Sequence, residues 1–303
     1  MKKTKIITSL VFSAMTIILG CFIYLKPFSK QIAGEQDEIS LFLENVMIRE
    51  NGIYTLLGSK PITSFRIENE KFPQSREEVV SEYKRLIDDN PSFEARLSFV
   101  DYETSVNEAK NMKHLRHEEL WASWIQAYGD KKSAKYLFIS RPSPHAVGNE
   151  GFFVNIPMTT YTLSIYQELF QKRTGIIFDP KQILKEIFSE HSEFWEKVFK
   201  DHFLIGILLG YGKRNAFIWE LEDQASDTLR CDANNLMIDD SEYSKILVKE
   251  KITISDLLIP FFISYSIFDL EIEKYWQERE SIINTISQTH FSSQILKLLG
   301  YEE

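Results

Sequence analysis

The feature that most constrains this chain is an apolar segment near its N-terminus, which runs from Ile6 to Leu25. The segment contains no charged residue and no proline, and three lysines precede it. As a helix it would be roughly 30 Å long, about the thickness of the hydrocarbon core of a bilayer. The sequence therefore predicts a basic leader at residues 1–5 and a transmembrane signal anchor at residues 6–25.

Two other interpretations of this segment stay open. The residues from Ile18 to Cys21 resemble the signal of a bacterial lipoprotein, in which Gly20 is the small residue before an acylated Cys21. A cleaved signal peptide needs an apolar core of only about 7–15 residues, followed by a small-x-small exit. This sequence lacks such an exit, and the apolar residues from Phe22 to Leu25 continue past the cysteine. Both observations favour the anchor.

The lysines around the segment predict its orientation. Three lie before it, whereas Lys26 and Lys30 follow it, so the excess of positive charge is on the N-terminal side. We expect a single-pass protein of the bacterial cytoplasmic membrane with its N-terminus inside. A tether at residues 26–36 would lead to one exported domain at residues 37–303, which could divide near residues 141–151, where prolines and glycines are densest.

Composition disfavours nucleic-acid binding and excludes sites built from cysteines. The formal net charge is −9 at pH 7, and an acidic domain repels the phosphate backbone of nucleic acids. The chain has only two cysteines, Cys21 and Cys231, and Cys21 lies in the apolar segment. This excludes a disulfide scaffold and a zinc site built from cysteines. No cofactor is expected, because no motif for one was found.

Hydrophobic periodicity and helix-end signals predict an α+β fold that is predominantly helical, with one small, mostly antiparallel sheet. Helices are expected at 37–49, 75–88, 104–128, in series through 159–225, at 269–287 and at 292–299. Strands are expected at 53–57, 61–67, 136–139 and 152–156, with an edge strand at 257–263 around Pro260.

A glycine turn followed by two cations is the most distinctive internal motif. It comprises Gly210, Gly212, Lys213, Arg214 and Asn215. Backbone N–H groups at such a turn before a helix can bind an anion, and the cations would assist. The alternative is a corner between two helices, with the glycines ending one and the asparagine capping the next.

This motif, within the stretch Gly206–Glu220, and a second stretch, Asn51–Pro61, together resemble proteins of unknown activity from chlamydia-like and other intracellular bacteria. The resemblance implies an exported or membrane-associated protein. It implies no catalytic residues.

Two further groups are candidate sites. His114 and His117 are three residues apart, and on one helix both imidazoles could reach the same metal ion. Because no third ligand follows from the spacing, a solvated helix face is the alternative. Arg141, His145 and Glu150 share the loop predicted at 141–151, where a histidine beside a carboxylate could act as a general base.

Three functions are compatible with these features. The first is a membrane-anchored exported protein, not an enzyme, that binds another protein or a component of the bacterial envelope. The second is an enzyme that holds an anionic substrate at the turn formed by Gly210–Asn215, which requires Lys213 and Arg214 to point into one pocket. The third is a secreted effector, which requires the first thirty or so residues to be removed or to act as an address.

Overall fold

The computed structural model describes residues 38–301, except 70–72, 74, 90–98, 111, 132, 143–147, 190, 225–248, 250, 261, 263 and 265–268. The predicted span at residues 6–25, the tether and Cys21 lie outside this part of the chain. Among the helices that the structure describes, none has the length and apolar character that a membrane crossing requires.

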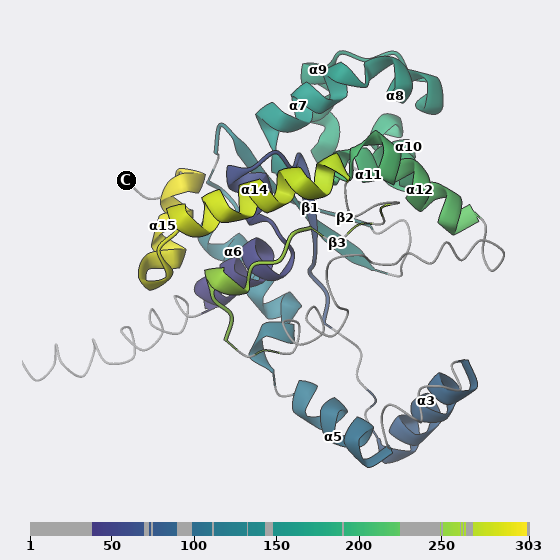
Figure 1. The fold of residues 1–303 in the computed structure, drawn as a ribbon, viewed down its shortest axis with the longest axis vertical. Helices are drawn as coiled ribbons and strands as arrows, with labels where there is room; N and C mark the ends of the chain where they lie inside the picture. The colour runs from purple at the N-terminus through teal and green to yellow at the C-terminus, as the bar shows by residue number, and fades with distance from the viewer. Residues whose placement is uncertain are drawn as a thin grey trace, which may run out of the picture.

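One three-stranded antiparallel sheet lies at the centre of the molecule (Figure 1). Its strands are β1 (Ile62–Arg66), β2 (Tyr136–Pro142) and β3 (Asn149–Asn155), in the order β1-β3-β2. The register places Ser64 opposite Phe152 and Ile139 opposite the same residue from the other side. The prediction of a mainly helical α+β fold with one small antiparallel sheet is confirmed.

Helices make up most of the remaining described chain. Before β1 lie a helix that includes residues 38–44, its π-helical continuation η1 (Asn45–Arg49) and α2 (Ile53–Leu57). Between β1 and β2 lie α3 (Arg76–Asp89), α5 (Phe99–Ala109), η2 (Lys113–Leu115) and α6 (His117–Tyr128). After β3 come α7 (Ile156–Ile165), α8 (Gln167–Thr174), α9 (Pro180–Lys185), η3 (Glu186–Phe188), α10 (Glu193–Lys200), α11 (His202–Leu208) and α12 (Gly212–Gln224). The chain ends with η4 (Ile254–Asp256), α14 (Leu270–Thr285), η5 (Gln288–His290) and α15 (Phe291–Leu299).

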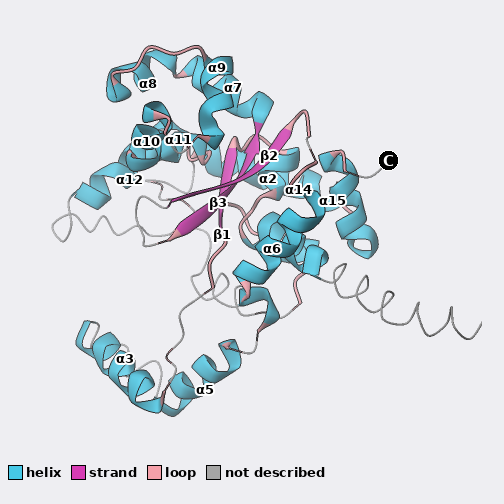
Figure 2. Cartoon of the chain, turned by 180° about the vertical axis from the view of Figure 1, so that it is seen from behind, coloured by secondary structure: helices cyan, strands magenta, loops and turns pink. Residues whose placement is uncertain are grey.

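The sheet separates two hydrophobic cores, because alternate side chains of a strand point to opposite faces. Phe65 and Phe153 belong to the first core, which packs against α2, α6, α14 and α15. Ile62 and Val154 belong to the second core, which is built mainly by α7 to α11. Figure 2 shows these two sets of helices on opposite sides of the strands. The sheet is thus the middle layer of three.

Several helix ends have a local cause in the sequence, which supports the prediction of the helices at 75–88, 159–225 and 292–299. The Ser75 hydroxyl accepts a hydrogen bond from the backbone N–H of Glu78 at 3.2 Å, before α3. Asp179 caps α9, with Pro180 in the first turn, and Gly300 ends α15 with a φ of 82°. A capping side chain satisfies backbone N–H groups that have no partner within the helix. These local signals therefore locate the ends well.

The strand predicted at residues 53–57 is wrong, because this segment forms α2. Asn51 adopts a φ of 60° and ends the preceding helix, after which the N–H of Leu56 donates to the carbonyl of Gly52 at 3.0 Å. Ile53, Tyr54 and Leu56 are all buried in the first core. Burial of the whole turn outweighs the strand preference of its residues.

Two predicted long helices are interrupted. The one expected at 104–128 ends at Ala109 and begins again at His117, with η2 between. Within the helical series expected through 159–225, the chain breaks at Asp201, whose carboxylate accepts a hydrogen bond from the N–H of Leu204 at 2.9 Å and starts α11. An internal cap of this kind competes with continuation of the helix.

Two smaller predictions are also wrong. The helix expected to begin at Thr159 or Thr160 begins earlier, because the Asn155 side chain accepts a hydrogen bond from the N–H of Met158 and Pro157 follows the cap. The segment around Pro260 forms no strand at residues 257–260. The suggested division of the domain near 141–151 stays a prediction. Both ends of this range belong to strands, β2 and β3, which pair with each other.

Candidate functional site

An open groove of about 350 Å³ lies on the surface of the second core. It is formed by the connection between α8 and α9, by α9 itself, and by the start of α10. Apolar and acidic side chains share the lining: Ile176, Ile177, Phe178, Asp179, Gln182, Ile183, Glu186, Glu193 and Phe194. We call this feature the α9–α10 groove.

The connection that forms one wall of the groove is fixed at both ends. Gly175 ends α8 with a φ of 72°, a backbone conformation that glycine adopts without strain. The hydroxyl of Thr174 donates to the carbonyl of Phe170 at 2.7 Å and accepts from the N–H of Ile176 at 3.2 Å. The Gln167 amide donates to the carbonyl of Phe178 at 2.7 Å. The wall is therefore held in place before any ligand arrives.

Neighbouring side chains of this connection have opposite environments. Phe178 is only 7% exposed and lies against the ring of Phe194, with centroids 4.6 Å apart. Ile177 is 90% exposed, the largest exposed fraction among the exposed large hydrophobic residues of the described chain. Burying an isoleucine side chain is worth about 1.5–3 kcal/mol. Ile177 is therefore available to gain that free energy from a partner.

The floor of the groove belongs to the second core. The indole N–H of Trp195 donates to the carbonyl of Ile183 at 2.7 Å and joins α10 to α9. Ile183 and Phe194 are 6% and 2% exposed. The groove thus has a rigid apolar floor and a mixed rim.

The rim carries three carboxylates, from Asp179, Glu186 and Glu193, and no lysine or arginine is among the lining residues. Glu193 forms an ion pair with Lys197 at 2.8 Å, one helical turn along α10. The groove therefore presents negative charge next to an exposed aliphatic side chain.

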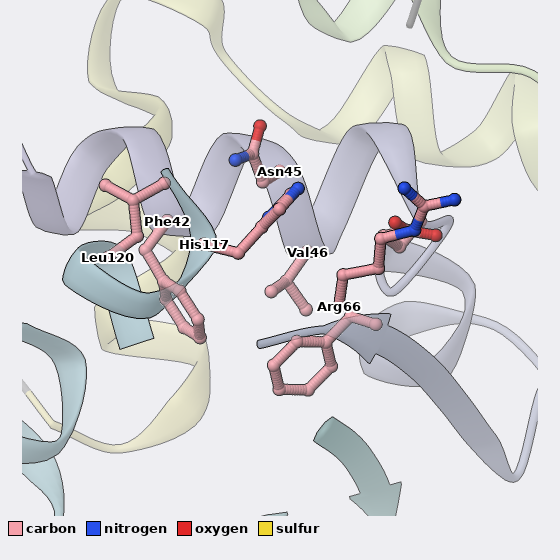
Figure 3. Close-up of a pocket in the computed structure, with 8 residues that line it drawn as sticks. Phe42, Asn45, Val46, Arg66, His117 and Leu120 are labelled. Carbon is pink, nitrogen blue, oxygen red and sulfur yellow. The ribbon is translucent and has the colours of Figure 1, made fainter. Parts of the chain in front are cut away.

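A second polar feature lies beside the first core, where Lys60 is buried and Arg66 is exposed. Glu50, Lys60, Arg66, His117 and Glu150 interact electrostatically there, and we call them the Glu50 cluster. A small cavity beside it is lined by Phe42, Asn45, Val46, Glu50, Phe65, Arg66, His117 and Leu120. Figure 3 shows Phe42, Asn45 and Val46 on one helix, facing His117 and Leu120 of α6 and Arg66 of β1.

Burial shifts the pKa values of this cluster. It raises the pKa of the Glu50 carboxyl, an effect that Arg66 and Lys60 oppose. It lowers the pKa of Lys60 to about 8, opposed by Glu50. It also lowers the pKa of His117 to about 4, assisted by the positive charge of Arg66. Burial likewise raises the pKa of Glu150, while a hydrogen bond from Ser64 lowers it.

Perturbed pKa values often mark catalytic sites, but they also occur in structural ion-pair networks. The cavity at the Glu50 cluster has a volume of about 10 Å³, which admits about one water molecule. It has no room for a substrate. We therefore interpret the cluster as an internal polar network that joins η1, β1 and α6.

The predicted anion site forms the corner between α11 and α12. Gly210 and Gly212 have φ values of 82° and 75°. Lys213 and Arg214 are exposed on the first turn of α12, and no cavity described here is lined by them. Asn215 is 1% exposed.

Carboxylates of α14 and its cap lie at this corner. A Cβ added to Gly212 would lie 2.8 Å from Cγ of Glu271. The Asn215 amide donates to the carbonyl of Tyr211 at 3.0 Å and to Oδ1 of Asp269 at 3.1 Å. These negative charges disfavour an anion at the turn. The residues form a corner between α11 and α12, as in the alternative, but Gly212 begins α12 and Asn215 lies in the first turn of that helix instead of capping it.

The two histidines do not share a helix face, because His114 lies in η2 and His117 begins α6. The carbonyl of His114 accepts a hydrogen bond from the Asn45 amide at 2.7 Å. Among the residues that the structure describes, no group of three or more His, Cys, Asp or Glu side chains could hold a metal ion.

The three loop candidates are not together in a loop, since Arg141 lies in β2, Glu150 lies in β3, and His145 lies outside the described residues. The Arg141 guanidinium donates to the carbonyls of Ile187 and Ser189 at 2.7 and 3.0 Å. It also lies 5.0 Å from the ring centroid of Phe199. Its position is that of a structural link between β2 and η3.

Searches for relatives found no matching protein-family model, no matching curated protein and no matching solved structure. The resemblance to proteins of chlamydia-like bacteria therefore stays a prediction.

Sequence reasoning did not find the α9–α10 groove or the Glu50 cluster. For the groove, one local signal exists: three apolar residues, 176–178, lie between a helix-ending Gly175 and the helix-starting Asp179–Pro180. A short apolar connection between two helices cannot bury every side chain, and Ile177 is the one left outside. No local signal brings the segment of Glu50 and Lys60 near Glu150, since the pairing of β1 with β3, in which Arg66 lies opposite Glu150, joins distant parts of the chain.

Proposed function

We propose that this chain is a membrane-anchored exported protein whose helix-rich domain binds a partner protein through the α9–α10 groove. The observation that carries the proposal is the exposure of Ile177, at 90%, on the wall of a groove of about 350 Å³. Exposed apolar side chains in a concave, preformed surface are typical of recognition sites.

The anchoring half of the proposal depends on residues 6–25, whose length and composition suit a membrane-spanning helix. The three lysines before this segment support an inside N-terminus and an exported domain. An anchor of this kind would confine the groove near the membrane, where a partner embedded in or bound to the envelope meets it at high effective concentration.

The enzyme hypothesis receives no comparable support. The turn at Gly210–Asn215 lies beside the carboxylates of Asp269 and Glu271, and the cavity at the Glu50 cluster is the size of a water molecule.

Photo-cross-linking in cells tests this proposal. A benzophenone amino acid would replace Ile177 in the full chain, and a matched chain would carry it at Tyr161, which is 61% exposed on α7 and does not line the groove. We expect a discrete protein adduct in the membrane fraction from position 177 and none from position 161. Equal adducts from both positions, or none from position 177, would contradict the proposal.

A further inference from the structure

The charges of the α9–α10 groove limit the kind of partner that fits it. Every charged residue in its lining is acidic. The nearest lysines along the same helices are Lys181 and Lys185 of α9 and Lys197 of α10, and none of them lines the groove. Lys185 donates to the Gln182 side chain at 3.1 Å, and Lys197 pairs with Glu193. A partner with negative charge would therefore be repelled at the rim.

Two of the carboxylates retain unused hydrogen-bonding capacity. Oδ1 of Asp179 accepts from the N–H groups of Lys181 and Gln182 at 3.0 and 2.9 Å. Oε2 of Glu186 accepts from the hydroxyl of Ser192 at 2.9 Å. Within the described chain, no hydrogen bond reaches Oδ2 of Asp179 or Oε1 of Glu186. A carboxylate held by one oxygen is fixed in orientation and can accept from a cation through the other.

We propose that the groove binds a segment of the partner that carries lysine or arginine side chains, and this inference rests on the proposed function. The charged group of such a side chain would hydrogen-bond to Asp179 and Glu186, while its methylene stem covers Ile177. Lysine and arginine bury their stems on apolar surface while the charged end stays at a polar rim. The combination of an exposed isoleucine with two oriented carboxylates matches that side-chain chemistry.

The volume of the groove suits a short segment of a partner protein. A volume of about 350 Å³ is at the lower end of the range of about 300–1,000 Å³ for ligand pockets. It accommodates one or two side chains of a peptide. Fixed carboxylates at the rim also speed the approach of a cationic segment at low salt.

The test measures peptide binding to the full chain in a non-ionic detergent by isothermal titration calorimetry. The probe is the peptide acetyl-Gly-Lys-Lys-Leu-Lys-Lys-Gly-amide, and the matched control peptide has glutamate in place of each lysine. We expect saturable binding of the lysine peptide and at least tenfold weaker binding of the glutamate peptide. Raising the salt concentration should weaken binding of the lysine peptide.

Two variants locate the binding. In Asp179→Asn combined with Glu186→Gln, the helix cap is retained, because asparagine caps as well as aspartate, and we expect at least tenfold weaker binding of the lysine peptide. Ile177→Ser keeps both carboxylates, and we expect a loss of about fivefold. An unchanged affinity in either variant, with an unchanged melting temperature, would overturn the inference.

Two other outcomes distinguish the inference from the proposed function. If cadaverine, a small diamine, binds as tightly as the lysine peptide, the groove is a site for free amines and the inference is overturned. If the lysine peptide does not bind while position 177 still gives an adduct in cells, the inference fails and the proposed function stands. Peptide binding without a cellular adduct would support the inference and contradict the proposed function.

Discussion

The Glu50 cluster and the α9–α10 groove both gather carboxylates, but they do so in opposite environments. In the cluster, burial raises the pKa of Glu50 and lowers that of Lys60, and the opposite charges of the two groups oppose these shifts. In the groove, the carboxylates stand at the surface next to Ile177, which is 90% exposed. The comparison indicates that the cluster stabilises the fold, whereas the groove is available for recognition.

Substitutions in the groove should affect stability very differently at a buried position and at an exposed one. The largest change in the free energy of unfolding is expected at the buried position. Phe178→Ala should lower the free energy of unfolding by about 3–5 kcal/mol, because it leaves a cavity beneath the groove. Ile177→Ala, at the next residue, should change it by no more than about 0.5 kcal/mol, because that side chain is exposed. Urea unfolding of the full chain in non-ionic detergent would measure both. Similar values for the two would show that the groove is not formed as described.

Breaking the Glu50 cluster should have the second largest effect. Glu50→Gln removes the carboxylate whose negative charge opposes the fall in the pKa of Lys60 that burial causes. The substitution should lower the free energy of unfolding by on the order of 2 kcal/mol. Adding Lys60→Met should recover more than half of that loss, since the buried ammonium group is then removed as well. A double-mutant cycle from urea unfolding measures this coupling, and strict additivity would mean that the two residues do not interact.

Local rules were sufficient for much of this fold. The cap at Asp179–Pro180, the Ser75 cap and the strand at residues 62–66 all follow from nearby residues. They could be predicted because their causes, a missing N–H partner and a short run of β-branched and aromatic residues, are contained in a few consecutive residues.

The failures have tertiary causes. The segment at residues 53–57 has the composition of a strand but forms α2, because Tyr54 packs edge-on against Tyr275 of a distant helix, with centroids 5.3 Å apart. Neither the α9–α10 groove nor the Glu50 cluster was predicted. In each, tertiary packing brings together residues that do not form a recognisable motif in the sequence. The candidates chosen from motifs, such as Gly210 and Arg141, instead hold the fold together through contacts with Tyr275 and Ile187.

The pH dependence of stability should distinguish the two regions further. The pKa of His117 is lowered from 6.5 to about 4 in the folded chain, so the unfolded chain binds the proton more readily between these values. Stability should therefore fall as the pH is lowered from 6.5 to 4, by on the order of 1–2 kcal/mol after allowance for partial exposure. His117→Gln should remove this part of the slope, whereas Glu186→Gln in the groove should leave it in place. Thermal unfolding across that pH range is the measurement.

Among the charged groups, the smallest loss of stability is expected at the ion pair on α10. Lys197→Gln removes the partner of Glu193 and a hydrogen bond to the carbonyl of Thr174 at 2.8 Å. The stability loss should stay near 0.5–1 kcal/mol, as for other exposed pairs. Lys197→Gln also leaves the carboxylate of Glu193 at the rim without its lysine partner. We therefore expect binding of the lysine peptide to strengthen about twofold to threefold. A weaker affinity would mean that Lys197 itself contributes to the site.

The most direct test of the central claim is the accessibility of position 177 in intact spheroplasts. A full chain with Cys21→Ser, Cys231→Ser and Ile177→Cys would be exposed to a membrane-impermeant maleimide, beside a matched chain with the cysteine at buried Ile183, which is 6% exposed. The account predicts rapid labelling at position 177 alone, on protein that stays in the membrane pellet. Labelling of position 177 only after lysis, or on protein released into the supernatant, would contradict it.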